Sequence, residues 1–192
     1  PALLINYPYI SYTLEGEQRQ QNENLESLTN NYILALLLVY ILLAILFKSY
    51  IQPIIVMSAI PFGIIGAVIG HLLLGINFSI LSMIGIVALS GVVVNDSLVL
   101  IDFINRYHRQ GHSIQEAALE SGQARFRPIL LTSITTFVSL IPLLLEKSLQ
   151  AQFLIPMAIS LGFGVLFSTF ITLILVPNGV IIVDNFREKY FN

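Results

Sequence analysis

Five long runs of apolar residues dominate the chain and determine its predicted architecture. They cover about residues 32–47, 53–74, 78–104, 128–145 and 153–176. Each run approaches or exceeds the ~20 residues that a helix needs to cross ~30 Å of hydrocarbon. Strands in lipid would leave backbone groups unpaired, so these runs predict helices. We therefore predict an all-α membrane protein whose residues 31–192 form a bundle of five transmembrane helices.

Residues 1–30 lack such a run and precede the first predicted helix. Residues 7–16 alternate weakly, which predicts a strand ending in a turn, and residues 17–29 are polar and predict a lead-in helix. We interpret this segment as the end of a domain outside the membrane. The chain begins with Pro1 and no cleavable signal follows, so we expect a segment of a longer protein.

A helix is also predicted between the third and fourth runs, over about residues 113–124. Ser113 and Glu116 have the spacing of a capping box, in which each side chain bonds the other residue's backbone N–H. Its modest apolar face predicts a helix that lies along the inner membrane interface. A simple connector is the alternative.

Composition supports lipid as the solvent for much of the chain. Hydrophobic residues make up 56% and charged residues 10%, with a mean hydropathy of +0.83, whereas soluble domains are about 25% charged. The net charge of −2 argues against a nucleic-acid partner. The absence of cysteine excludes disulfides and thiolate metal sites.

Basic residues predict the orientation, because cytoplasmic loops carry the excess of Lys and Arg. If the five spans alternate, Arg19 and Lys147 lie on one side. The other side receives Lys48, Arg106, Arg109, Arg125, Arg127, Arg187 and Lys189. This distribution predicts a periplasmic N-terminus and a cytoplasmic C-terminus.

The third run contains an acid at membrane depth, Asp96, flanked by Asn95 and Ser97. A charged carboxylate there costs about 2.5–3.5 kcal/mol even on insertion scales. Such a group either faces a polar interior or carries a proton, so Asp96 is a candidate proton-binding residue. A buried acid that only ties helices together is the alternative. Asp102 lies nearer the cytoplasmic end and is within reach of Arg106 one turn later.

The fourth run opens with basic residues and continues with hydroxyls. Thr132 is the predicted partner of Asp96, because both lie one to three turns from the cytoplasmic surface. Most hydroxyls in lipid bond their own backbone, which is the alternative for each of them. Arg125 either reaches the membrane surface or guards a water-filled entry to Asp96.

Small residues and prolines predict helix contacts and kinks. Gly66 and Gly70 match the small-xxx-small pattern of packed membrane helices. Pro61 and Pro142 lie inside runs and predict kinks. His71 lies near the outer end of the second run, where we expect an interfacial side chain.

Enzyme classes find no support in the sequence. The segment 88–91 lacks the first glycine of the intramembrane serine-protease GxSG motif, and no second membrane acid pairs with Asp96. His71, His108 and His112 lack metal-ligand spacing. We expect neither an enzyme nor a bound cofactor.

Two segments carry a family resemblance: residues 91–105, Gly-Val-Val-Val-Asn-Asp-Ser-Leu-Val-Leu-Ile-Asp-Phe-Ile-Asn, and residues 125–133, Arg-Phe-Arg-Pro-Ile-Leu-Leu-Thr-Ser. Together with residues 14–17 and 47–53, the chain resembles the resistance-nodulation-division (RND) superfamily, and most of all its hydrophobe/amphiphile multidrug exporters of the acriflavine-resistance type. The resemblance implies the last five spans of a twelve-helix permease, with residues 1–30 ending its second periplasmic loop.

The same resemblance implies function and partners. The family works as homotrimers in the bacterial inner membrane, exchanges protons for drugs or amphiphiles, and uses the proton-motive force without a cofactor. Many members pass substrate to a periplasmic adaptor and an outer-membrane channel. A non-transporting membrane module, like the related halves of sterol-sensing or protein-secretion proteins, is the alternative, and an intramembrane protease a more distant one.

The resemblance also implies a proton relay, with one departure from the family pattern. The relay's acid pair belongs to a helix of the first half, outside this chain. The lysine that usually faces the pair corresponds to Asn95, and the following position, commonly Asn, is Asp96. Thr132 matches the relay threonine, and Arg125 matches a basic residue near the cytoplasmic water path. We therefore expect Asp96 to bind protons directly.

Overall fold

A computed structural model describes residues 17–191 of the chain, and every regular element among them is a helix. The helices are α1 (Glu17–Phe47), α2 (Gln52–Met57), α3 (Ile60–Leu74), α4 (Ile80–Arg109), α5 (Ile114–Leu145) and α6 (Leu149–Phe191). Five helical segments are long and apolar enough to cross a membrane, with α2 and α3 together forming one of them. The predicted all-α class with five long apolar helices is confirmed. The strand predicted over residues 7–16 lies outside the described residues.

The chain divides into two compact units, residues 1–38 and 39–192. In the first unit, the described residues belong to α1, which runs without a break from the polar lead-in into the first apolar run. The predicted lead-in helix is thus present. Arg19 Nε donates to Glu23 Oε1 at 2.9 Å, one turn apart on an exposed surface, and such a pair stabilises a helix by only about 0.3–0.5 kcal/mol.

The second apolar run is divided between α2 and α3 by a break at residues 58–59. Pro53 and Pro61 each stand in the first turn of their helix, where the missing proline N–H has no intrahelical partner to lose. Ser58 Oγ donates to the Ile55 carbonyl at 2.6 Å across the end of α2. The kink expected at Pro61 therefore takes the form of a break immediately before it.

Side-chain caps fix the beginnings of α4 and α5. Ser79 and Ser82 cap α4 reciprocally, with Ser79 N donating to Ser82 Oγ at 3.0 Å. In α5, Ser113 N donates to Glu116 Oε2 at 3.1 Å, and Glu116 N donates to Ser113 Oγ at 3.2 Å. The predicted capping box is confirmed, and it begins α5 directly after the turn at Gly111, whose φ is +98°.

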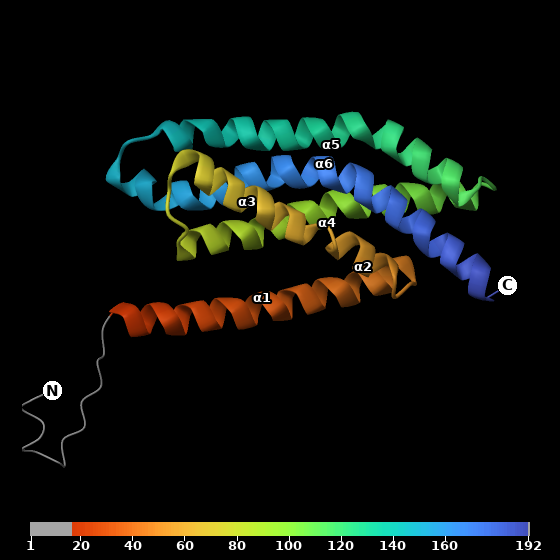
Figure 1. Cartoon of the computed structure of the whole chain (residues 1–192), viewed down its shortest axis with the longest axis horizontal. Coiled ribbons are helices and arrows are strands. Elements are labelled where there is room, and N and C mark those ends of the chain that lie inside the picture. The colour runs from red at the N-terminus through yellow and green to blue at the C-terminus, as the bar shows by residue number, and fades with distance from the viewer. Residues whose placement is uncertain (1–16, 192) are drawn as a thin grey trace, which may run out of the picture. The chain divides into compact units, whose positions relative to one another are not determined.

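The helix that begins at Ser113 does not end near residue 124, as the sequence predicted, but continues to Leu145 as α5. Pro128 lies inside α5 and removes one backbone hydrogen bond without ending the helix. At 1.5 Å per residue, its 32 residues span roughly 48 Å, more than ~30 Å of hydrocarbon. The predicted separate interfacial helix is therefore absent from the described residues, and its residues form the first part of α5. The helix α5 bends near this first part (Figure 1). The fifth span likewise continues past Pro177 to Phe191.

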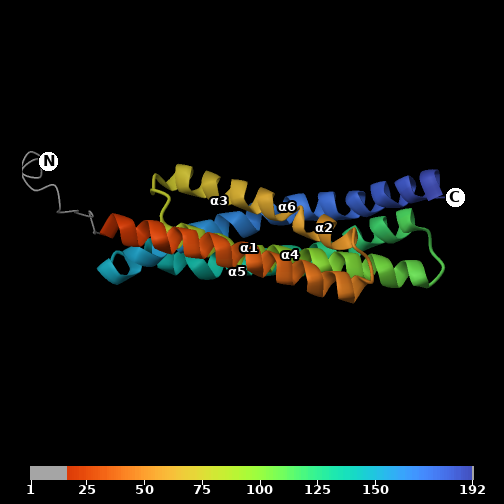
Figure 2. The ribbon, with the colours of Figure 1, turned by 90° about the horizontal axis from the view of Figure 1, so that it is seen from below.

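Helix α6 packs against α3, α4 and α5, and α4 also packs against α2, α3 and α5. In both ribbon views, α3 to α6 run along one direction and successive helices alternate in sense (Figures 1 and 2). A methyl carbon added at Gly66 would lie 2.4 Å from Phe167 Cβ, and one at Gly70 would lie 2.6 Å from Phe163 Cβ. The predicted small-xxx-small contact is therefore real and joins α3 to α6.

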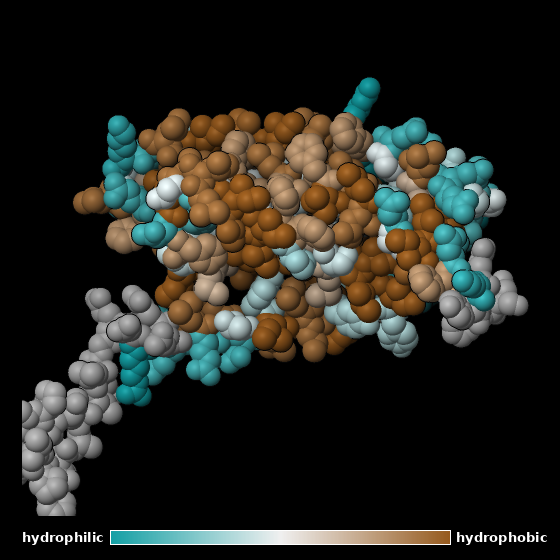
Figure 3. Space-filling model, viewed as in Figure 1, coloured by the Kyte–Doolittle hydropathy of each residue, from teal (hydrophilic) through white to brown (hydrophobic). Residues whose placement is uncertain are grey.

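The links between α1 and α2 and between α4 and α5 lie at the same end of the second unit as the chain's C-terminus (Figure 1). There, Gln52 and Asn105 exchange two amide hydrogen bonds of 2.9 and 3.0 Å, joining α2 to α4. Arg106 donates to the Asp102 carboxylate, as predicted. Hydrophobic side chains form a broad band between this end and the opposite one, and hydrophilic ones gather at the two ends (Figure 3). This distribution fits a bundle that crosses a bilayer.

Candidate functional site

Asp96 lies on the inner face of α4, and only 8% of the residue is exposed. Its neighbours on this face, Val93 and Leu100, are buried as well, because residues three and four apart share one face of a helix. Within residues 17–191, no hydrogen bond or ion pair to the Asp96 carboxylate is present. The following residue, Ser97, donates its hydroxyl to the Val93 carbonyl at 2.8 Å, so it serves its own helix.

The contact between Arg125 and Phe103 sets the register of α5 against α4. The Arg125 guanidinium carbon lies 5.4 Å from the Phe103 ring centroid, so these two residues lie at one level. Asp96 precedes Phe103 by seven residues, and Thr132 follows Arg125 by seven residues. The two helices are antiparallel, so seven residues back along α4 and seven residues forward along α5 both lead about 10 Å away from the α4–α5 link. On this register Asp96 and Thr132 lie at a similar level along the bundle.

At this depth α5 presents two hydroxyls with different surroundings. Thr132 is exposed on the chain's own surface and donates to the Ile129 carbonyl at 2.8 Å. Ser133 is buried, and its Oγ lies 2.5 Å from Thr169 Oγ1 on α6. The sequence did not predict this Ser133–Thr169 pair. The available signal was the cluster of Ser and Thr in both apolar runs, since such residues hydrogen-bond across membrane helices.

Asn95 is exposed, although its neighbour Asp96 is buried. Successive residues of a helix point about 100° apart, so the two side chains serve different faces of α4. The exposed face of α4 also includes Gly91, beside which an added methyl carbon would meet no atom within 4 Å. The four predicted site residues therefore do not form a single hydrogen-bonded cluster among the described residues.

Arg125 is half-buried and rests on the Phe103 ring. A cation over an aromatic face contributes about 0.5–2 kcal/mol, depending on desolvation. Its Nε is buried and donates to no acceptor within the described part of the chain. The Phe103 ring thus holds the Arg125 cation in place while its Nε–H can still donate a hydrogen bond. Along α5, Arg125 lies about 10 Å from Thr132.

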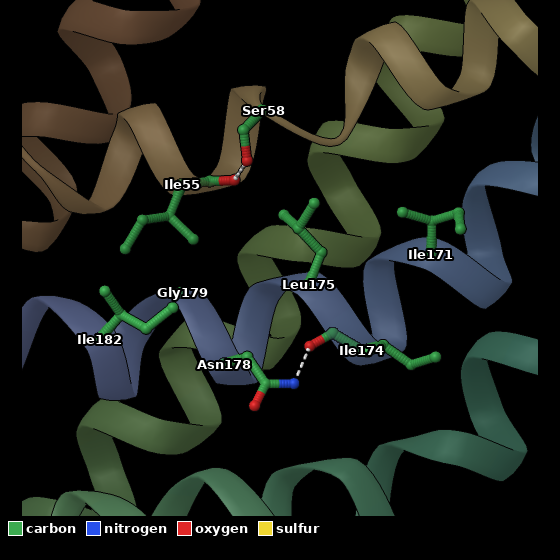
Figure 4. A pocket seen from close by; sticks show the side chains of 8 residues that line it. All are labelled: Ile55, Ser58, Ile171, Ile174, Leu175, Asn178, Gly179 and Ile182. Atoms are coloured by element: carbon green, nitrogen blue, oxygen red, sulfur yellow. Dashed lines mark hydrogen bonds between the residues drawn. The ribbon is translucent and has the colours of Figure 1, made fainter.

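A groove of about 480 Å³ lies elsewhere, between α2 and α6. It is lined by Ile55, Ser58, Ile171, Ile174, Leu175, Asn178, Gly179 and Ile182 (Figure 4). Its two polar side chains already donate to their own helices, Ser58 to Ile55 and Asn178 to Ile174 at 2.6 Å each. None of the four predicted site residues lines this groove, so it contributes no chemistry to the candidate site.

Comparison with known protein families assigns the chain. The family model described as AcrB/AcrD/AcrF matches residues 7–184. The chain belongs to this family. Multidrug resistance protein MdtC of Proteus mirabilis is 31% identical over 179 residues, which are 93% of this chain and 17% of that protein. Swarming motility protein SwrC of Bacillus subtilis is 38% identical over 161 residues, 81% of this chain and 15% of that protein.

Solved structures agree on the fold of this AcrB/AcrD/AcrF family member. Two crystal forms of a heavy metal efflux pump superpose with TM-scores of 0.77 and 0.79 at 24% identity, and they cover 96% and 95% of this chain. The chain corresponds to 18% of the pump's length. The chain is therefore a segment of an AcrB/AcrD/AcrF family protein, and it spans less than a fifth of the relatives and solved structures that it matches.

Proposed function

We propose that this chain is the C-terminal membrane half of a proton-driven RND multidrug exporter of the bacterial inner membrane, and that Asp96 binds the transported proton. The observation that carries the proposal is the burial of Asp96 on the inner face of α4, where no described residue neutralises its charge. An ionisable group at membrane depth is costly, and such groups are typically retained where ions or protons pass.

The free energy of burying Asp96 depends on whether its carboxyl carries a proton. An ionised Asp96 requires a cation or several hydrogen-bond donors, whereas the protonated carboxyl is neutral and tolerates a buried position. Binding and release of the proton therefore favour different helix arrangements, and this difference couples proton movement to conformational change. The hydroxyl pair of Ser133 and Thr169, next to Thr132 on α5, is the polar contact that we propose for Asp96 in one arrangement.

The exposed positions of Asn95 and Thr132 support a relay completed by the rest of the permease. The chain spans about a sixth of the relatives it matches, so residues on its surface can face helices of the other half. Asn95 supplies hydrogen bonds but no fixed positive charge at the family's lysine position. We propose that Asp96 consequently takes up protons itself, and that Arg125 guides water and protons from the cytoplasmic side.

The proposed orientation places the end that holds the α4–α5 link in the cytoplasm. Seven basic residues lie toward that end, and Lys147 lies in the opposite link between α5 and α6, which matches the positive-inside rule. The N-terminus is then periplasmic. By family analogy, we propose a homotrimer that exports drugs or amphiphiles through a periplasmic adaptor and an outer-membrane channel.

The test is Asp96→Asn in the intact permease, reconstituted in proteoliposomes with an imposed pH gradient. Ethidium movement and internal pH are recorded together. We expect the variant to lose ethidium transport coupled to proton flux, while Asp96→Glu retains part of it. Asp102→Asn is the matched control, since Asp102 already pairs with Arg106 near the end of α4. Proton-coupled transport by a correctly assembled Asp96→Asn permease would refute the proposed role.

A further inference from the structure

His71, which the sequence predicted to be interfacial, is buried among the helices of this chain. It lies in the last turn of α3, and 5% of the residue is exposed. Nδ1 lies 2.9 Å from the Ala67 carbonyl oxygen, and Nε2 lies 2.8 Å from Ser82 Oγ on α4. The imidazole also packs on the Phe78 ring, with centroids 5.2 Å apart. The ring therefore ties α3 to α4 beside the link that joins them.

The hydrogen-bond partners determine the protonation state of the imidazole. A carbonyl oxygen only accepts, so Nδ1 carries the hydrogen that is donated to Ala67. In the neutral ring Nε2 then accepts, and the Ser82 hydroxyl donates to it. The Ser82 oxygen in turn accepts from Ser79 N at 3.0 Å. Both ring nitrogens and the Ser82 hydroxyl are thus satisfied when His71 is neutral.

A second proton would disrupt this network. Nε2 would become a donor to Ser82 Oγ, and the Ser82 hydroxyl would have to turn its hydrogen from Nε2 toward Ser79 Oγ, 3.4 Å away. The new charge would also lie without a counterion, since His71 has no carboxylate within 4.0 Å among the described residues. The elements packed around His71 offer no counterion either. Apart from His71 itself, no titratable side chain occurs in α3, in the link, in the first half of α4 or in most of α6, which are residues 60–70, 72–95 and 149–183. A buried charge without a partner is strongly unfavourable, so protonation favours an opened arrangement.

The end of α3 is built to permit such a movement. The backbone carbonyl of His71 accepts from Gly75 N and from Ile76 N, the latter at 3.1 Å. Gly75 adopts a left-handed conformation with φ +66°, which glycine adopts without strain. The His71 side chain, which holds the hairpin closed, therefore lies next to the Gly75 turn, which allows the hairpin to open. On the other side of α3, Phe163 of α6 packs against Gly70 and supplies only apolar contact.

We propose that His71 is a further protonation site of the permease, and that the unpaired charge it gains on protonation opens the α3–α4 hairpin. The hairpin link lies at the end of the bundle opposite the α4–α5 link (Figure 1). In the proposed orientation this end is periplasmic, where a proton-driven exporter takes up protons. The periplasmic role rests on the proposed function, whereas the latch itself does not.

The experiment measures the hairpin directly in the intact permease, in phosphatidylcholine nanodiscs without substrate or pH gradient. Nitroxide labels replace the exposed Leu73 of α3 and Ile84 of α4 in a background without other cysteines. Electron paramagnetic resonance then reports the distance between them at pH 8 and pH 5. We expect a longer and broader distance distribution at pH 5, fully reversed at pH 8.

Three variants decide the interpretation. His71→Gln retains an amide oxygen that accepts from Ser82 and does not titrate, so its hairpin should stay closed at both pH values. Ser82→Ala removes the latch partner and should give the open distribution at both. Asp96→Asn should keep the pH response of the latch even if it abolishes transport. An unchanged distance in the otherwise native protein, or an identical pH response in His71→Gln, would overturn the proposal without affecting the test of Asp96.

Discussion

The contact between α4 and α6 depends on the missing side chain of Gly85. A methyl carbon added there would lie 2.5 Å from the Met157 carbonyl oxygen and 2.8 Å from Ser160 Cβ. The first of these atoms belongs to the α6 backbone and cannot rotate away. Restoring an ordinary separation of 3.4 Å requires the two helices to part by about 0.9 Å at this level. We therefore expect Gly85→Ala to destabilise the bundle by the cost of overpacking, about 1–3 kcal/mol.

A matched substitution separates overpacking from the general effect of replacing glycine in a helix. Gly122 lies inside α5, and an added methyl carbon there would meet no atom within 4 Å. Both substitutions gain the higher helix propensity of alanine, up to about 1 kcal/mol. This gain cancels when the two variants are compared, so their difference reports the contact with α6 alone. We expect Gly122→Ala to be at least as stable as the starting protein.

The assay is the thermal stability of the intact permease in detergent, followed by the loss of assembled protein on size exclusion after heating. For a folding unit of roughly 150–250 residues, the size range of this chain, 1 kcal/mol corresponds to roughly 2–4 °C in Tm, and to less in a larger cooperative unit. Gly85→Ala should therefore melt several degrees below Gly122→Ala. Equal melting temperatures would mean that α4 and α6 do not approach as closely as the structure shows.

Three further predictions concern hydrogen bonds between and within helices. Alanine substitutions at Gln52 and Asn105, measured singly and together by thermal unfolding, should show a coupling of about 1 kcal/mol, and additive effects would contradict the paired amides. Ser113→Ala should weaken the first turn of α5 by about 1 kcal/mol, seen as faster amide hydrogen exchange confined to that turn. Ser133→Ala should lower stability by about 0.6 kcal/mol, whereas Thr132→Val should leave the chain's own packing unchanged. A melting temperature that is lower for Thr132→Val than for Ser133→Ala would argue against the buried hydroxyl pair.

Local chemistry made part of the fold predictable from the sequence. The five apolar runs required helices because lipid offers no partner for unpaired backbone groups. The capping box at Ser113 and Glu116 depends on residues three apart, and the Asp102–Arg106 pair depends on residues four apart. Such interactions form within one helix, so neither needs knowledge of its neighbours. The length of α5 was harder to predict, because Pro128 removes only one backbone bond and the remaining bonds continue the helix.

The sequence by itself determined that Asp96 lies inside an apolar helix long enough to cross a membrane. It also predicted Thr132 near the same level, because depth follows from position along a helix. Only the tertiary structure decided which way the side chains point: Asp96 inward, Asn95 outward, and His71 into a hydrogen bond with the next helix. The rotation of a helix about its axis is fixed by packing against its neighbours, through contacts as close as those of the α3 and α4 glycines with α6. When a helix is apolar on nearly every side, its hydrophobic periodicity does not show which side faces its neighbours.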